Sequence, residues 1–257
     1  MSENKTGKYF KYAVGEILLV MIGILLALQV NNWNEKRIEG EKIKAQYLSL
    51  ITALLEDKEN LEAYLNIQSF RTHSLDYVLD FIGEAHKYDD TSNALKVPFF
   101  NSFIWNKSIP DTLNTEFIEK AFSWSFRYRP FILNQKAINE FESTGMYSLI
   151  ENKDLKLQIN KYYSRVQWRL LNNQQGSMDI NTSRWQSEMI DEGIYLMDVT
   201  NYSNPLSLVK DNPMRIALIK YILADSNWRA NNAIEFIQMI KELIQLIYKE
   251  LETESYK

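Results

Sequence analysis

An apolar run near the N-terminus constrains this chain more than any other feature. It reads YAVGEILLVMIGILLALQV from Tyr12 to Val30, with one charged residue, Glu16, and one amide, Gln29. As a helix rising 1.5 Å per residue, the run would extend roughly 28 Å, which matches the hydrocarbon thickness of a bilayer. We therefore predict a transmembrane helix over residues 12–30 and expect the lipid bilayer to be a partner.

A cleaved signal peptide is the alternative interpretation of this run, because Lys5, Lys8 and Lys11 precede it. Signal peptidase requires small residues one and three positions before the cut, and no such pair follows Ala27. Aromatic residues of the kind found in interfacial belts flank the run on both sides: Tyr9, Phe10, Tyr12 and Trp33. These features favour an uncleaved signal anchor.

Basic residues flank the run on both sides, so the predicted orientation rests on the short N-terminal tail. This tail abuts the span directly, as in ordinary signal anchors, whereas the far flank carries a similar charge at Lys36, Arg37, Lys42 and Lys44. The tail favours a cytoplasmic N-terminus, with the opposite orientation as the alternative. We predict a cytoplasmic tail over 1–11, the span over 12–30 and an extracytoplasmic helical domain over 31–257, periplasmic if the membrane is a bacterial inner membrane.

The composition narrows the fold class and the kinds of site. There are 8 glycines and 5 prolines in 257 residues, too few for a β-sandwich or barrel with a turn about every 8–12 residues. Without cysteine there is no disulfide or thiolate metal site, and His73 and His86 are too few for a three-histidine zinc site. The net charge of −4 does not suggest nucleic acid as a partner. We expect an all-α protein with no metal and no cofactor.

The hydrophobic pattern predicts a bundle of long helices after the span. One helix is expected over about 35–82, continuous with the span, because apolar residues recur at helical spacing: Ile43, Tyr47, Leu50, Leu54 and Leu61. The pattern fails over about 84–112, where turn residues are mixed with Phe99, Phe100, Phe103, Ile104 and Trp105. We expect this irregular segment to pack on the helices; a partner-binding loop is the alternative.

Shorter helices are expected in the middle of the chain. One follows Asn114 and is broken before Pro130, and another runs from Phe131 to Glu142, with Gly145 as a left-handed C-terminal cap. Asn152 is placed to cap the next helix. Asn212-Pro213 is a helix start, and that helix is expected to stop near residues 225–227.

The last helix, expected over about 228–252, has the most regular pattern outside the span. Its apolar residues alternate between spacings of three and four, the repeat of a coiled-coil seam: Ala230, Ala233, Ile237, Ile240, Ile244, Ile247 and Leu251. Ile234, Leu243 and Leu246 widen this stripe beyond a two-helix seam. We interpret the helix as one wall of an intramolecular bundle, packed on the first long helix; a subunit contact is the alternative.

Two segments resemble a known family. The first is KYFKYAVGEILLVMIGILLALQVNNWNEKR, residues 8–37, and the second is FESTGMYSLIENKDLKLQINKYY, residues 141–163. Both are similar to recurring elements in a family of uncharacterised single-pass inner-membrane proteins of Bacteroidota, catalogued as a domain of unknown function. The resemblance covers about a fifth of the chain. It implies an inner-membrane location and a helical extracytoplasmic region, and it implies no activity.

One face of the span is suited to contact another helix. Its residues are spaced as a seam of threes and fours: Glu16, Val20, Gly23, Ala27 and Val30. Gly23 and Ala27 are small enough to let a second helix approach closely, and an intramembrane acid usually faces protein or water. The alternative is that Glu16 reaches back to the near interface. At the other end of the span, a polar exit cluster could hydrogen-bond between helices or be solvated by headgroups: Gln29, Asn31, Asn32 and Trp33.

The sequence contains none of the common catalytic or nucleotide-binding motifs, GxxxxGK[ST], GxGxxG, HExxH or GxSxG. We therefore expect no enzyme but a membrane-anchored helical scaffold or interaction protein that forms a homo-oligomer, with another membrane or periplasmic protein as a further partner. The alternative function is an ion-linked, stator-like subunit that uses Glu16. It is weakened because the chain lacks the peptidoglycan-binding or small α/β domain of such proteins.

Overall fold

The computed structural model describes residues 5–84, 97–127, 130–172, 177–199, 202 and 204–254. Every regular element among these residues is helical, which confirms the all-α prediction. The α-helices are α1 (Lys5–Phe81), α2 (Thr115–Ser125), α3 (Lys136–Ser143), α4 (Lys153–Val166), α5 (Ser177–Asp191) and α6 (Pro213–Glu254). The described residues also form two 3-10 turns, η1 (Met146–Leu149) and η4 (Pro205–Leu208), and a π-helical segment, η2 (Gln167–Leu171).

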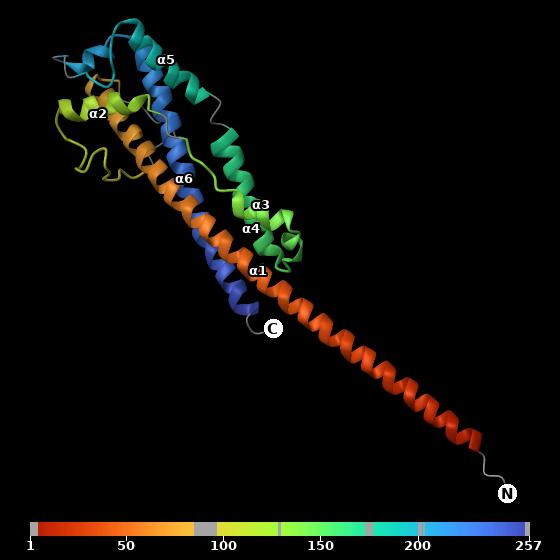
Figure 1. Cartoon of the computed structure of the whole chain (residues 1–257). Coiled ribbons are helices and arrows are strands. Elements are labelled where there is room, and N and C mark those ends of the chain that lie inside the picture. Colours follow the sequence, from red (N-terminus) through yellow and green to blue (C-terminus); the bar gives the residue numbers. More distant parts are fainter. Residues whose placement is uncertain are drawn as a thin grey trace.

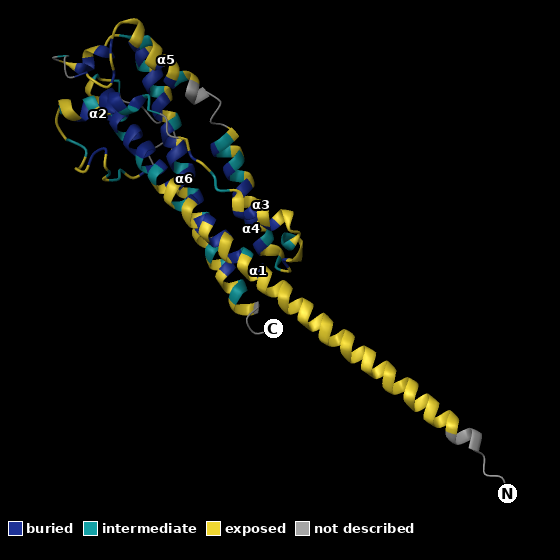
Figure 2. Cartoon of the chain, viewed as in Figure 1, coloured by how far each residue is buried: buried dark blue, intermediate teal, exposed yellow. Residues whose placement is uncertain are grey.

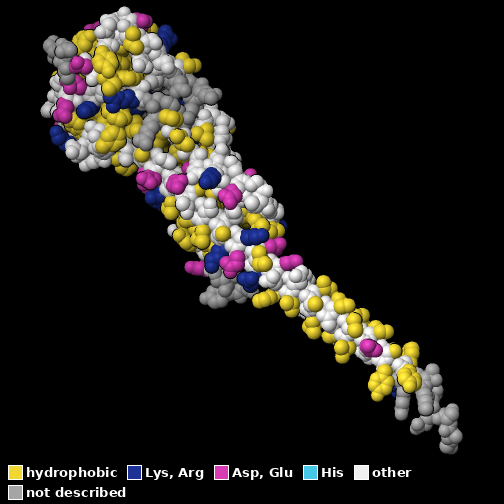
Figure 3. All heavy atoms as spheres, in the orientation of Figure 1, with side chains coloured by type: hydrophobic (Ala, Val, Ile, Leu, Met, Phe, Trp, Pro, Cys, Tyr) yellow, Lys and Arg dark blue, Asp and Glu magenta, His cyan; other side chains and the backbone are white. Residues whose placement is uncertain are grey.

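Helix α1 is a rod of 77 residues, about 115 Å long, whose N-terminal half extends away from the rest of the molecule (Figure 1). Every side chain from Tyr9 to Lys42 is exposed. The apolar part of this half is the one stretch among the described residues that is long and apolar enough to cross a membrane. Hydrophobic side chains cover its visible face (Figure 3).

Helix α6 runs antiparallel to the C-terminal half of α1 and makes the most extensive helix–helix contact in the structure. The stop expected near residues 225–227 is wrong, because α6 is one helix of 42 residues. Ser226 at this point is fully buried, and its hydroxyl donates to the carbonyl of Ile222 within the helix (2.7 Å). Burial against α1 therefore sustains the helix through a polar stretch that resembled a stop in the sequence. The heptad residues of α6 pack on α1, as the bundle interpretation predicted.

Side-chain caps start the shorter helices where the sequence placed them. The Asn114 carbonyl Oδ1 accepts from the Phe117 amide (2.9 Å), and Asn152 Oδ1 accepts from the amides of Asp154 and Leu155 (both 3.1 Å). Gly145 has a φ of 74°, the left-handed conformation that glycine adopts without strain. The three local predictions are confirmed.

The helix expected from Phe131 begins at Lys136 instead. Phe131 is buried, with its ring 6.4 Å from that of Tyr64, and the Asn134 amide donates to Asp57 Oδ1 (2.7 Å). Contacts with α1 therefore hold residues 131–135 in a non-helical conformation. The sequence pattern could not reveal these contacts because the partners are some 70 residues away.

Two hydrophobic clusters stabilise the bundle. The lower one joins α1 residues 43–65 to α3, α4 and the C-terminal half of α6; the upper one joins α1 residues 67–79 to α2, α5 and the N-terminal part of α6. Of the irregular segment, residues 97–112 are described, and they contain no helix or strand. Val97, Ile104 and Trp105 are buried there, whereas Phe103 is exposed and contacts the Trp124 ring. This part of the segment packs mainly on the helices.

Candidate functional site

The predicted face of the span lies on the exposed half of α1. All of its five residues are exposed, and a Cβ added at Gly23 would meet no atom within 4 Å. Glu16 lines a shallow depression on the surface of this helix together with Ala13, Val20 and Ile24. The face thus offers a small-residue surface that no described part of the chain covers, and its role in helix contact stays a prediction.

The polar exit cluster is also exposed. Asn31 Nδ2 donates to Glu35 Oε1 one turn further along α1 (2.8 Å), so it has a partner within its own helix. Residues 31–42, which include most of this cluster, form a stalk about 18 Å long, in which a single helix is exposed on every side. The stalk separates the span from the bundle.

Helix α1 has a covered and a bare side where the bundle begins. Between residues 43 and 62, the covered side carries the residues that pack on α3, α4 and α6, among them Ile43, Leu50 and Leu54. The opposite side is exposed at Leu48, Thr52, Leu55 and Glu59. Figure 2 shows the change along α1 from exposed on all sides to buried on one side.

The face of the span and the bare side of α1 point in the same direction. At 3.6 residues per turn, Val30 and Leu48 are five turns apart, and Glu16 and Thr52 are ten turns apart. Because α1 is one uninterrupted helix, the five residues of the predicted face lie on the side away from the bundle. We call the bundle, the described residues from 43 onward, the head. A second helix could therefore approach the predicted face of the span without colliding with the head of the chain that carries this face.

Sequence reasoning missed a buried acid in the bundle. Asp57 on α1 is fully buried; its Oδ1 accepts from the Asn134 amide (2.7 Å) and its Oδ2 accepts from the hydroxyl of Tyr162 on α4 (2.9 Å). Burial raises the pKa of Asp57 to about 6, although both hydrogen bonds favour the charged form. The carboxylate ties α4 and the extended residues before α3 to α1.

A second buried polar layer lies between the two hydrophobic clusters. Arg71 on α1 and Arg229 on α6 are each 1% exposed. Arg71 Nη2 donates to the Ser125 carbonyl at the end of α2 (2.6 Å), and Arg229 pairs with Asp225 (3.1 Å) and with the Tyr64 hydroxyl (3.3 Å). Burial lowers the pKa of Arg71 to about 10. These bonds hold α2 and α6 against α1 at the centre of the bundle.

A sequence signal for both polar layers existed. The stripe of α1 runs in steps of three and four from Ile43 to Val78, and three positions on it are polar: Asp57, Gln68 and Arg71. All three are buried. Asp57 and Arg71 make buried hydrogen bonds whose partners are set by the tertiary structure, whereas the side chain of Gln68 has no hydrogen-bond partner among the described residues.

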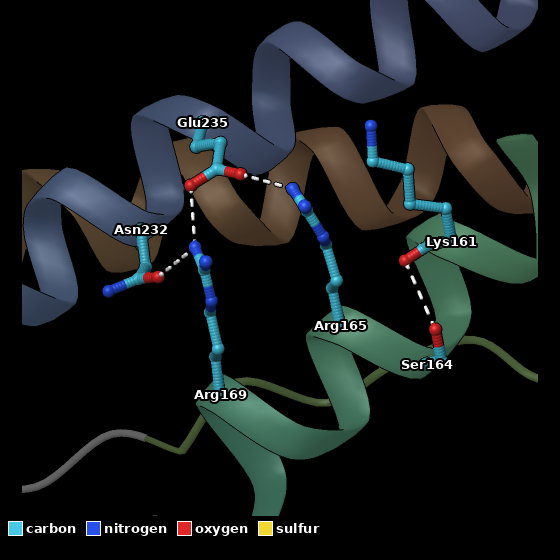
Figure 4. A network of polar contacts seen from close by, with 6 residues as sticks. All are labelled: Lys161, Ser164, Arg165, Arg169, Asn232 and Glu235. Carbon is cyan, nitrogen blue, oxygen red and sulfur yellow. Dashed lines mark hydrogen bonds and ion pairs between the residues drawn. The ribbon is translucent and has the colours of Figure 1, made fainter.

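A polar network on the surface of the bundle joins α4 and η2 to α6 (Figure 4). Arg165 and Arg169 each donate to one oxygen of Glu235 (2.8 and 2.6 Å), and Arg169 also donates to Asn232 Oδ1 (3.1 Å). Lys161, one turn earlier on α4, lies near Ser164, whose hydroxyl donates to the Lys161 carbonyl (3.4 Å). Because the charged side chains are 29–40% exposed, solvent weakens the ion pairs, and we interpret the network as a structural clamp.

The described residues contain no group of three or more His, Asp or Glu side chains arranged to hold a metal ion. The chain matches no family model, no curated protein and no solved structure at a significant level.

Proposed function

We propose that this protein is a membrane-anchored helical scaffold that self-associates through its span. One observation carries the proposal: α1 passes without a break from the apolar segment into the bundle, and its predicted contact face lies on the side away from the head. Pairing through Gly23 and Ala27 would bring two helices close together while their heads remain on opposite sides.

The uninterrupted helix also suits a scaffold. The helical stalk holds the head about 18 Å from the end of the span. A continuous helix therefore fixes both the height of the head above the membrane and its orientation about the helix axis. The resemblance to single-pass inner-membrane proteins agrees with an anchor whose head is periplasmic. The head would then present its surface to another membrane or periplasmic protein.

Cysteine cross-linking in native membranes tests the proposal, because the natural chain has no cysteine. Ala27→Cys places a thiol on the contact face, and Leu25→Cys places one on the opposite face of the same helix, within about 3 Å of the same depth. We expect oxidation to produce a dimer with Ala27→Cys and little or none with Leu25→Cys. Equal cross-linking of the two variants, or none with either, would contradict self-association through this face.

A further inference from the structure

We infer that a second copy of this chain binds along the bare side of α1 above the membrane, so that the dimer interface continues from the span to the base of the head. We define the outer face as the uncharged surface formed by Ala45, Leu48, Ser49, Thr52 and Leu55. This inference rests on the proposed self-association, because it extends the same contact beyond the bilayer.

The outer face has the character of a helix-pairing surface. Leu48 and Leu55 are 48% and 50% exposed and lie seven residues apart, the repeat of a coiled coil. The residues between them on this side are small and uncharged, Ser49 and Thr52. By contrast, the leucines on the other side of the same helix, Leu50 and Leu54, are fully buried against the bundle.

The membrane is too far away to cover this face. Leu48 lies 18 residues beyond Val30, which corresponds to roughly 27 Å along a helix. That distance places the two exposed leucines well outside the hydrocarbon layer that covers the span. Lipid is therefore not the occupant of the outer face.

The geometry of anchoring favours a second copy. Two copies that cross the same bilayer in the same sense have parallel α1 helices. If they pair through the face containing Gly23 and Val30, the outer faces come next to each other, since Val30 and Leu48 lie on the same side of the helix. Leu48 and Leu55 then meet their counterparts in the partner, and the two heads lie on opposite outer sides.

Charges along the stalk agree with parallel pairing. On this side of α1 they alternate in sign from Arg37 to Glu41 to Lys44, each about one turn from the next. A parallel partner helix offers Glu41 both a basic residue one turn below and another one turn above. Beyond Leu55 the exposed side carries Glu56 and Glu59, and these like charges would repel their counterparts on a parallel partner helix. The charge pattern thus predicts that the interface ends near Leu55.

Single cysteines in the full-length protein test this inference in native membranes. We expect Leu48→Cys and Leu55→Cys to form disulfide-linked dimers on oxidation. Tyr248→Cys is the control, because Tyr248 is 50% exposed and follows Ile247 on α6, which is buried in the same cluster as Ile43 and Leu50 of α1. The control should remain monomeric.

The outcomes separate the two proposals. A dimer with Ala27→Cys but none with Leu48→Cys or Leu55→Cys would overturn the outer-face contact and leave span association intact. If none of these three cysteine variants formed a dimer, both the outer-face contact and association through the span would be overturned. A cross-linked product whose mass differs from that of a dimer of this chain would show a different partner and refute binding of a second copy.

A second variant tests the contact without cross-linking. Leu48→Glu with Leu55→Glu places four carboxylates in the proposed interface, and we expect dimerisation in detergent to weaken roughly tenfold or more. Because both side chains are exposed in the single chain, the helical content and the unfolding transition of the head should stay unchanged. Unchanged dimerisation with an intact head would contradict the inference.

Discussion

In the N-terminal half of α1, apolar side chains such as Leu26 are exposed, whereas in the C-terminal half charged side chains such as Asp57 and Arg71 are buried. The same helix continues through both halves, so backbone structure does not account for the contrast. The exposed apolar stretch is long enough to cross a membrane, and under the proposed function lipid and a partner helix would surround it. The buried charges require partners from distant parts of the chain, and α2, α4 and α6 supply them.

This contrast teaches that the two halves have different roles. Substitutions in the second half should affect the folding of the head, because its side chains are the centre of both hydrophobic clusters. Substitutions in the first half should affect anchoring and association and leave the head unchanged. Three predictions, in order of decreasing effect, test this division.

A matched pair of leucine substitutions should give the largest difference. Leu54 is fully buried, and Leu54→Ala should lower the free energy of unfolding by about 2–5 kcal/mol through lost burial and a cavity. Leu26 is 57% exposed on the span, and Leu26→Ala should change the unfolding of the head by less than about 0.5 kcal/mol. Urea unfolding in detergent, followed by tryptophan fluorescence, measures both. Similar losses in the two variants would show that the span and the head unfold as one unit.

The pH dependence of stability should reveal the buried carboxyl. Because the pKa of Asp57 is raised from 3.8 to about 6, the folded state holds a proton that the unfolded state has released. This contribution is complete below about pH 4 and is lost as the pH rises through about 6. Asp57→Asn should therefore increase the free energy of unfolding by about 1–3 kcal/mol at pH 7.5 and change it little at pH 4.

The control for this prediction is Glu59→Gln, which removes a carboxylate from an exposed position two residues away on α1. Its stability should follow the natural protein across the same pH range. Burial also raises the pKa of Asp76 to about 6, so a smaller slope should remain in Asp57→Asn. If the pH profiles of Asp57→Asn and the natural protein ran parallel, the assignment of this slope to Asp57 would be wrong.

The smallest effect is expected in the stalk. Gly40 lies within α1 with open space around it, so Gly40→Ala should stabilise the stalk helix by about 1 kcal/mol. Amide hydrogen exchange over residues 31–42 should slow roughly fivefold. At Gly193 the same substitution should have the opposite effect on stability. The φ of Gly193 is 72°, a conformation that strains residues other than glycine, so Gly193→Ala should destabilise the head by about 1 kcal/mol. Faster exchange in Gly40→Ala would contradict a continuous stalk helix.

Local signals predicted the parts of the fold that depend on neighbouring residues. The helix start after Asn114, the cap at Asn152 and the left-handed Gly145 lie where the sequence placed them, because each involves residues within about one helical turn. The predictions failed where distant contacts decide: α6 continues through Ser226, and residues 131–135 stay non-helical. Among the candidate site residues, the sequence identified the seam on the span, but it did not show on which side of α1 the head would lie.

The sequence by itself determined a helical protein with an apolar segment long enough to span a bilayer, because composition and local periodicity govern both properties. The sequence also predicted that the bundle helix continues from the span, but only the tertiary structure decided which side of that helix is bare and that this side coincides with the seam. It also decided that Asp57 and Arg71 are buried, since their partners Tyr162 and Ser125 come from elements 105 and 54 residues away. The physical reason is that the packing of α6, α4 and α2 on α1 fixes which side of the helix is covered, and local sequence cannot specify that packing.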